Sequence, residues 1–364
     1  MNCKNIAIAL MGLLAASNAS ADTCCTMKTN ARDPIAFVRE MGVGWNLGNA
    51  FDSIGPDETA WGNPSPTPEL IDAIADRGFQ TIRIPVTWHA HFGKAPAYTI
   101  DPAWFDRVER IVRHALERDL FVVLNTHHEN EWTIPLAEEA DEVSKKLDRV
   151  WTQIATRFRD YDERLIFEPL NEPRVEGTPV EWSGGTEEER ACINRFQEVA
   201  LEAIRATGGA NATRMVLIAQ HAAATHPEVM EALEIPHDDP HTLISVHVYF
   251  PVPFALFDEP DWGTEADKAA MREKLDRIHA HFVAQGRGVV IGEWGSMNND
   301  NLETRVEHAR TFVREAEARD MATIWWDNGG RDEFGIIDRH THEWIFPEIV
   351  DVILEEGRTG SAAD

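Results

Sequence analysis

Two glutamates stand just beyond short apolar runs, where a carboxyl group could do chemistry. Glu172 comes shortly after the apolar residues 165–167, and Pro173 then prevents further sheet pairing. Glu293 directly follows the apolar run at 288–292. Two carboxyl groups that face each other are the groups that hydrolyse glycosidic bonds, one as the acid and the other as the nucleophile or base. The two glutamates are therefore a candidate catalytic pair if the fold brings them together.

Polar and aromatic side chains follow the other apolar runs. An arginine and a tyrosine hydroxyl beside a carboxylate favour its ionised state, which a nucleophile needs. A negatively charged neighbour and partial burial help an acid to keep its proton near neutral pH. Tryptophan suits the apolar face of a sugar ring, while Asn and His suit its hydroxyl groups. The candidate residues besides the two glutamates are Asn46, Arg83, His127, His128, Asn171, His247, Tyr249, Trp325, Trp326 and Asp327.

Apolar segments alternate with helical segments along the chain. Residues 120–126 are apolar on both faces, which is typical of a parallel strand covered by helices. Eight such strand-then-helix units predict an α/β fold, a single-domain (β/α)8 TIM barrel, in which the C-terminal ends of all strands open onto one face. An open doubly wound sheet is the alternative, but no glycine-rich dinucleotide fingerprint follows the first strand. The predicted strands are 43–47, 81–85, 120–126, 165–167, 215–219, 243–247, 289–292 and 322–326, and the predicted helices are 68–77, 102–118, 137–158, 187–207, 227–233, 264–285, 303–319 and 344–355.

Composition restricts the class of protein and its partners. The 364 residues are 43% hydrophobic and 26% charged, which fits one soluble globular unit. The formal net charge of −28 argues against nucleic acid or an anionic membrane as partner, because those need clustered Lys and Arg. We expect a monomer.

The N-terminus has the pattern of a secretory signal. Lys4 precedes an apolar run at 6–16, and small residues at 19–21 provide a cleavage site. The run is too short for a membrane span, although an anchored N-terminal helix is an alternative. We therefore expect a secreted or periplasmic protein. The expected divisions of the chain are a signal peptide at 1–21, a flexible lead-in at 22–33, the catalytic barrel at 34–358 and a flexible tail at 359–364.

Six motifs occur in order, one at each of six predicted strand ends. Together they resemble the cellulases of glycoside hydrolase family 5, which are retaining (β/α)8-barrel enzymes. The resemblance runs from about Gly42 to Trp344, and the stretches 44–49 and 85–88 resemble the endoglucanase-rich part of that family. The motifs are Arg83-Ile84-Pro85, Asn125-Thr126-His127-His128-Glu129, Asn171-Glu172-Pro173, His247-Val248-Tyr249, Gly292-Glu293-Trp294-Gly295 and Trp325-Trp326-Asp327-Asn328-Gly329.

The resemblance implies an endo-β-1,4-glucanase that hydrolyses internal bonds of a β-glucan by double displacement, without a cofactor or metal ion. Glu172 would be the acid/base and Glu293 the nucleophile. Asn171 would hold the 2-hydroxyl of the sugar under attack. Arg83 and Tyr249 would set the ionisation and position of the nucleophile, and His247 would support the acid/base. His127 and His128 would line the same subsite, and Trp326 would be its sugar platform.

Some positions allow more than one interpretation. Side chains alternate along a strand, so only one of Trp325 and Trp326 points into the barrel mouth, and we choose Trp326. Similarly, one of His127 and His128 would touch sugar. Glu129 is expected to support its neighbours and not to react. Tryptophans in or near loops after the strands are candidates for more distant sugar contacts, namely Trp61, Trp132 and Trp182.

The same residues allow three alternatives. The substrate could be another β-1,4 polymer such as xyloglucan, mannan or xylan. The chain could be a non-catalytic glycan-binding barrel. His127, His128 and His247 could also bind a metal ion, but adjacent histidines on a strand point opposite ways, and the first predicted strand lacks the His-x-His of metal-dependent barrel hydrolases. A metal-dependent hydrolase would lose its activity on chelation.

Overall fold

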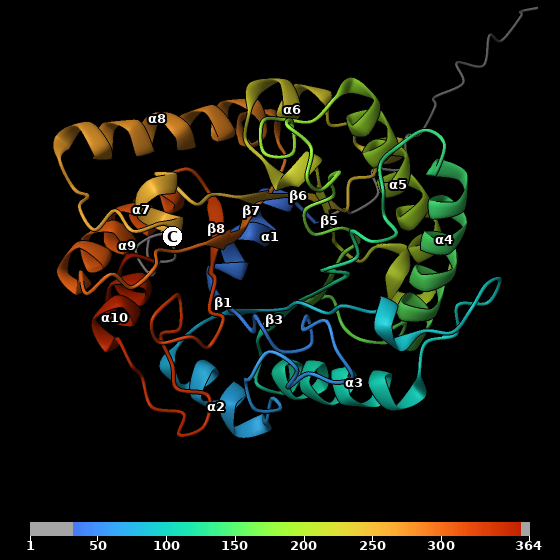
Figure 1. The fold of residues 1–364 in the computed structure, drawn as a ribbon, viewed down its shortest axis with the longest axis horizontal. Coiled ribbons are helices and arrows are strands. Elements are labelled where there is room, and N and C mark those ends of the chain that lie inside the picture. The colour runs from blue at the N-terminus through green and yellow to red at the C-terminus, as the bar shows by residue number, and fades with distance from the viewer. Residues whose placement is uncertain (1–31, 358–364) are drawn as a thin grey trace, which may run out of the picture. The chain divides into compact units, whose positions relative to one another are not determined.

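The structure, a computed structural model, describes residues 32–357 and is a closed barrel of eight parallel strands in chain order. Helices surround the strands, as Figure 1 shows for α3, α4, α5 and α8. The predicted fold class is therefore confirmed. The expected signal peptide at 1–21 and tail at 359–364 lie outside the described residues, as does most of the lead-in. No helix within 32–357 is long and apolar enough to cross a membrane.

The strands are short and buried throughout. Each contains four to six residues, and all are buried because helices cover the outside of the barrel and side chains fill its interior. The strands are β1 Val43–Asn46, β2 Thr81–Ile84, β3 Phe121–Asn125, β4 Leu165–Glu168, β5 Val216–Ala219, β6 Thr242–His247, β7 Val289–Trp294 and β8 Met321–Trp325.

Helix α2 begins and ends at the signals expected from the sequence. In α2 the Thr67 hydroxyl accepts a hydrogen bond from the Leu70 amide, Pro68 is the first helical residue, and Gly78 ends the helix with φ 113°. The helices are α1 Pro34–Met41, α2 Pro68–Arg77, α3 Pro102–Glu117, α4 Ala140–Arg157, α5 Glu187–Ala206, α6 Pro227–Ala232, α7 Val252–Leu256, α8 Glu265–His281, α9 Leu302–Glu317 and α10 Pro347–Glu356.

The structure corrects several predicted boundaries. Helices α1 and α7 were not predicted. The last helix begins at Pro347 instead of Trp344, because Trp344 forms a bridge with Ile337. Helix α8 ends at His281, and a short 3-10 helix continues to Gln285. These differences depend on packing between distant segments, which sequence periodicity does not record.

Helix α1 closes one end of the barrel. Its buried Phe37, Val38 and Met41 pack in a small apolar cluster with Phe121 and Leu243, which lie at the starts of β3 and β6. Figure 1 shows α1 within the ring of strands. The opposite end, where the strands finish, is therefore the end at which polar side chains can meet a ligand.

Candidate active site

The two candidate glutamates lie together at the C-terminal ends of their strands. A carboxylate oxygen of Glu172, a ring nitrogen of His247 and a carboxylate oxygen of Glu293 all lie within 4.8 Å of one another. The pairing of β6 with β7 shifts in register between Val246 and His247, so that His247 stands opposite Glu293. Such irregularities redirect side chains near active sites. Here the shift helps to bring His247 between the two carboxyl groups.

Glu293 is buried and held by donors on both oxygens. Arg83 donates to Oε1 at 2.8 Å, and the Tyr249 hydroxyl donates to Oε2 at 3.0 Å. His247 Nδ1 lies 3.6 Å from Oε2, and His127 Nε2 lies 3.9 Å from Oε1. The side chain is therefore fixed in one orientation among groups that favour its negative charge.

Arg83 is fully buried and connects several of these residues. Its Nε donates to Glu168 at 2.7 Å, its Nη1 also donates to Asn46 at 3.0 Å, and its Nη2 donates to Asn171 at 2.6 Å. Burial lowers its pKa, but the charges of Glu168 and Glu293 outweigh this effect and raise it. The guanidinium therefore remains positive and ties β1, β2, β4 and β7 together beneath the site.

Glu172 has a different environment from Glu293. It forms a 2.7 Å hydrogen bond with His247 Nδ1, and Arg174 Nη1 lies 3.5 Å from its other oxygen. Its side chain is 18% exposed, whereas that of Glu293 is 7% exposed. Glu172 is thus the carboxyl group of the pair that is more accessible from the cleft.

The three titratable groups are coupled through their charges. Burial raises the pKa of Glu293, the charge of Glu172 adds to this, and His247 and Arg83 oppose it, so that its pKa is raised. Burial also raises the pKa of Glu172, but the hydrogen bond and charge of His247 outweigh this and lower it. Burial lowers the pKa of His247, while Glu293 and Glu172 raise it above its usual value. The three groups therefore titrate as a unit that shares protons.

Aromatic rings form one wall beside Glu293. Trp326 and His127 lie parallel, with ring centroids 5.7 Å apart and an interplanar angle of 3°. Trp325 is buried, and its indole N–H donates to the carbonyl of Phe334. His128 is one-third exposed and contacts the ring of Trp61. Both members of the histidine pair are thus near the site, with His127 being the one beside Glu293.

Burial lowers the pKa values of His127 and His128, the latter to about 4. Both rings are therefore neutral near pH 7, and each can accept a hydrogen bond as well as donate one. Neutral imidazoles suit sugar hydroxyls, which need both kinds of partner.

Four further polar residues at the site were not predicted. Glu168 is fully buried and accepts hydrogen bonds from Arg83, Asn125 and Ser245. Arg174 contacts Glu172 and stacks on the ring of Trp182. The signal for Glu168 was its position between the apolar residues 165–167 and Leu170, because a buried carboxylate requires cationic or hydrogen-bonding partners. Asn125 belongs to the motif at 125–129 but was given no role there, and Ser245 leaves no comparable signal in the sequence.

Glu129, in contrast, organises a loop. Its carboxylate accepts hydrogen bonds from the Trp88 amide and the Trp132 indole, and it contacts the ring of His89. The side chain is buried among these partners. Its carboxylate is thus occupied in joining the loops that follow β2 and β3.

We expect Glu168→Gln to shift the acidic limb of the pH–rate profile to lower pH and to reduce kcat about tenfold. The single oxygen of glutamine can still accept from Arg83 and Asn125, while its NH2 group faces Ser245, whose hydroxyl must then turn to accept. The substitution removes a negative charge, so that Arg83 acts on Glu293 alone and lowers its pKa. The measurement is kcat/KM against pH. Ser245→Ala, which removes one hydrogen bond from Glu168, serves as the control and should leave the limb in place. An unchanged limb in Glu168→Gln would contradict this account.

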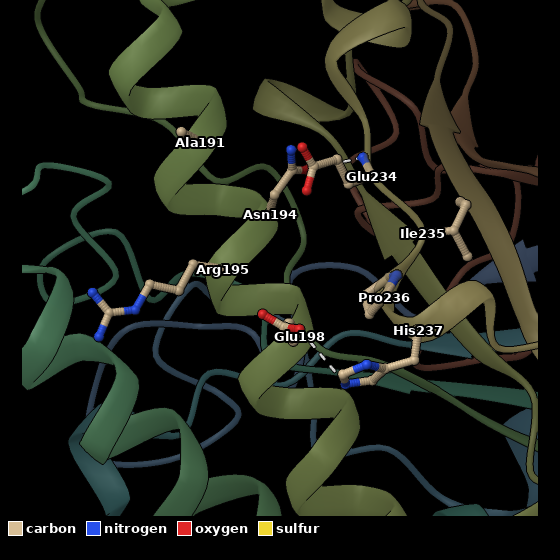
Figure 2. Close-up of a pocket in the computed structure, with 8 residues that line it drawn as sticks. All are labelled: Ala191, Asn194, Arg195, Glu198, Glu234, Ile235, Pro236 and His237. Carbon is tan, nitrogen blue, oxygen red and sulfur yellow. Dashed lines mark hydrogen bonds and ion pairs between the residues drawn. The ribbon is translucent and has the colours of Figure 1, made fainter.

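A separate cavity of about 260 Å³ lies between α5 and the loop before β6. Figure 2 shows Asn194 and Glu198 on the helix facing Glu234 and His237 on the loop. His237 lies within ion-pair distance of Glu198 and Glu202, and all three carry substantial solvent exposure. Glu172, His247 and Glu293 are not among the residues that line this cavity. Its contacts are those of ordinary surface ion pairs.

The chain is similar to known proteins of one family. A family model described as cellulase (glycosyl hydrolase family 5) matches residues 45–332. Endoglucanase B of Clostridium cellulovorans is 43% identical over 341 residues, which cover 90% of this chain and 77% of that protein. Cellulase/esterase CelE of Acetivibrio thermocellus is 43% identical over 327 residues, which cover 88% of this chain but only 40% of that protein.

A solved structure gives a similar result. ZgEngAGH5_4, in complex with a cellotriose, has a TM-score of 0.88 and 49% sequence identity, over 89% of this chain and 98% of that chain. The family model covers most of the chain and includes both candidate glutamates. The resemblance that the strand-end motifs indicated is therefore confirmed, and the chain belongs to glycosyl hydrolase family 5.

Proposed function

We propose that the protein is a retaining endo-β-1,4-glucanase that cleaves internal bonds of a β-glucan by double displacement. The observation that carries the proposal is the proximity of Glu172 and Glu293, whose nearest carboxylate oxygens lie within 4.8 Å. Retaining enzymes place these groups about 5–5.5 Å apart, whereas inverting enzymes leave about 6.5–9.5 Å for a water molecule. The spacing therefore favours direct attack by one carboxylate.

In the first step, Glu293 attacks the anomeric carbon of the sugar in the cleft. A bond forms between that carbon and a carboxylate oxygen, while the bond to the leaving oxygen breaks. Glu172 gives its proton to the leaving oxygen, which departs as a hydroxyl group. Arg83 and Tyr249 hold Glu293 ionised and oriented before the attack.

In the second step, the product of attack is hydrolysed. Glu172, now ionised, takes a proton from water, whose oxygen bonds to the anomeric carbon as the bond to Glu293 breaks. Both carboxyl groups then return to their starting states. Two inversions at one carbon give net retention of configuration.

His247 explains how a carboxyl group with a lowered pKa can act as an acid. An acid working alone would need a raised pKa, and a nucleophile working alone a lowered one. In this site the pKa of Glu172 is lowered and that of Glu293 is raised. The reason is that the proton of the Glu172–His247 pair can lie on His247, whose pKa is raised. The 2.7 Å hydrogen bond lets this proton move to Glu172 as the leaving oxygen approaches.

Neighbouring residues are placed to hold the sugar. Asn171 accepts from Arg83 through Oδ1, which fixes its amide orientation and directs the Nδ2 donor elsewhere, toward the sugar's 2-hydroxyl in this proposal. Trp326 provides a flat apolar surface beside His127. These contacts orient the ring so that the anomeric carbon meets Glu293.

The pH dependence of kcat/KM should be bell-shaped. On the acidic side, activity falls as Glu293 gains a proton, and because its pKa is raised this limb lies above the ordinary value of 4.5. On the alkaline side, activity falls when the Glu172–His247 pair loses its proton, and the raised pKa of His247 places this limb above 6.5. The profile is measured on a soluble β-glucan. Full activity near pH 4, or an alkaline limb with its midpoint below pH 6.5, would contradict these assignments.

The substrate class is tested with barley β-glucan, carboxymethylcellulose, xyloglucan, xylan and glucomannan. Purified protein should cleave β-1,4-glucan with a rapid fall in viscosity, which indicates cleavage within the chain. Predominant cleavage of xylan or mannan would retain the mechanism but change the substrate. A protein that binds these polymers without cleaving any of them would instead be a glycan-binding barrel.

A further inference from the structure

A pocket of about 570 Å³ opens beside Glu172. Its lining includes Glu172 and Tyr249 and comes mainly from the segments after β4, β5 and β6, whereas the parallel rings of Trp326 and His127 follow β8 and β3. The pocket and the sugar platform are therefore formed by different strand-end segments around the acid/base. If Glu172 protonates the leaving oxygen, this side receives the leaving part of the glycan. The volume is that of a typical small-ligand site.

Exposed aromatic rings border this pocket. Trp182 is 59% exposed and Phe257 is 61% exposed, although both are large apolar side chains. Arg174 stacks on the Trp182 ring, with its guanidinium carbon 4.3 Å from the ring centroid, and so supports the ring in its orientation. Rings presented in this way suit the apolar faces of sugars.

The pocket also contains an ammonium group without an acidic partner. Lys274, on α8, lines the pocket and is half-buried. Within residues 32–357 no carboxylate lies within ion-pair distance of it, and its contact is with the Phe250 ring, 5.4 Å from the centroid. Burial and the charge of Arg277 both lower its pKa. A ring contact of this kind satisfies none of the three N–H donors of an ammonium group.

This lack of a partner stands out in such an acidic protein. The chain has 62 acidic and 34 basic residues, and Lys268 on the same helix bonds Glu307 at 2.6 Å. Apart from histidines, the charged residues that line the pocket are Glu172 and Lys274. When Glu172 carries the proton required of an acid, the positive charge of Lys274 is uncompensated.

We propose that this pocket binds a carboxylate-bearing sugar unit on the leaving side of the scissile bond, with Lys274 as the residue that binds the carboxylate. The ligand class is a β-1,4-glucan substituted with uronic acid or carboxymethyl groups. A carboxylate would supply the opposite charge and the acceptors that Lys274 lacks, while Trp182 and Phe257 contact the sugar. The inference rests on the proposed function, because it assigns Glu172 to the leaving group.

The test compares two soluble cellulose derivatives with the same backbone. Carboxymethylcellulose carries anionic substituents, whereas hydroxyethylcellulose carries neutral ones. The ratio of kcat/KM values for the two polymers is measured for the wild type, Lys274→Met, Lys274→Arg and Lys268→Met. The Lys268 variant removes a charge from the same helix outside the pocket and controls for long-range electrostatics.

We expect Lys274→Met to lower the ratio about threefold to tenfold through loss of activity on the anionic polymer. Lys274→Arg should retain most of the ratio, and Lys268→Met should match the wild type. The effect of Lys274→Met should shrink in concentrated salt, because screening weakens the ion pair.

Two results would overturn the proposal: an unchanged ratio in Lys274→Met, or an equal fall in Lys268→Met. Activity on hydroxyethylcellulose shows whether each variant is folded and catalytically competent. Failure of the wild type to cleave either polymer would instead count against the proposed function, so the two failures are distinguishable.

Discussion

Replacing Glu293 by alanine is expected to reduce hydrolysis of soluble β-1,4-glucan by about four to six orders of magnitude. The variant lacks the oxygen that attacks the anomeric carbon, while Arg83 and Tyr249 lose their shared acceptor. The measurement is kcat on a soluble glucan. Glu293→Gln has nearly the same shape but is a poor nucleophile, and it should lose activity to a similar extent.

Azide offers a direct check of this role. A small anion could enter the space left in Glu293→Ala and attack the sugar from the same face, with the leaving group departing as before. The product should be an α-glycosyl azide, identified by NMR. A Glu293→Gln variant as active as the wild type would exclude the nucleophile role and revive the glycan-binding alternative.

Replacing Glu172 by alanine should reduce hydrolysis of natural glucans by about two to four orders of magnitude. The leaving oxygen of a sugar is a poor leaving group, so that it needs the proton that Glu172 and His247 hold between them. An aryl cellobioside with an acidic phenol needs little protonation. Its first step should therefore be much less affected, and the glycosyl-enzyme should accumulate in a burst of phenol release.

Azide distinguishes the two glutamates. In Glu172→Ala it should attack the glycosyl-enzyme from the face where water normally enters and give a β-glycosyl azide, the opposite anomer from that of Glu293→Ala. A loss of equal size for the natural glucan and the activated substrate would be inconsistent with an acid/base role. Thermal unfolding of both alanine variants checks that the fold is retained.

The arrangement of the site shows why these residues act together. Arg83 contacts Glu293 and Glu168 with two different nitrogens, although Glu293 is 210 residues away along the chain. Its one charge is therefore divided between a carboxylate at the surface of the cleft and one beneath it. This division limits how far Arg83 can lower the pKa of Glu293, whose pKa remains raised. The Glu168→Gln variant and the pH profile of the wild type both test how the charge of Arg83 is shared between Glu293 and Glu168.

The fold class and most of the elements could be predicted from local signals in the sequence. Strands such as β3 are apolar on both faces, and helices such as α2 have a capping residue, a first-turn proline and a terminal glycine. These signals are local, so they can be recognised without knowing which segments pack against one another. The family, too, could be identified from six ordered motifs, because each marks the end of one strand.

The assembly of the site, in contrast, depends on contacts between segments that are distant in the chain. The register shift between β6 and β7 places His247 opposite Glu293, and closure of the barrel brings Glu168 beneath Arg83. Helix α1 closes the other end, and Lys274 reaches the pocket beside Glu172 from α8. Hydrogen bonds, burial and shifts in pKa depend on distances between segments that are remote in the chain, and local periodicity contains no information about those distances.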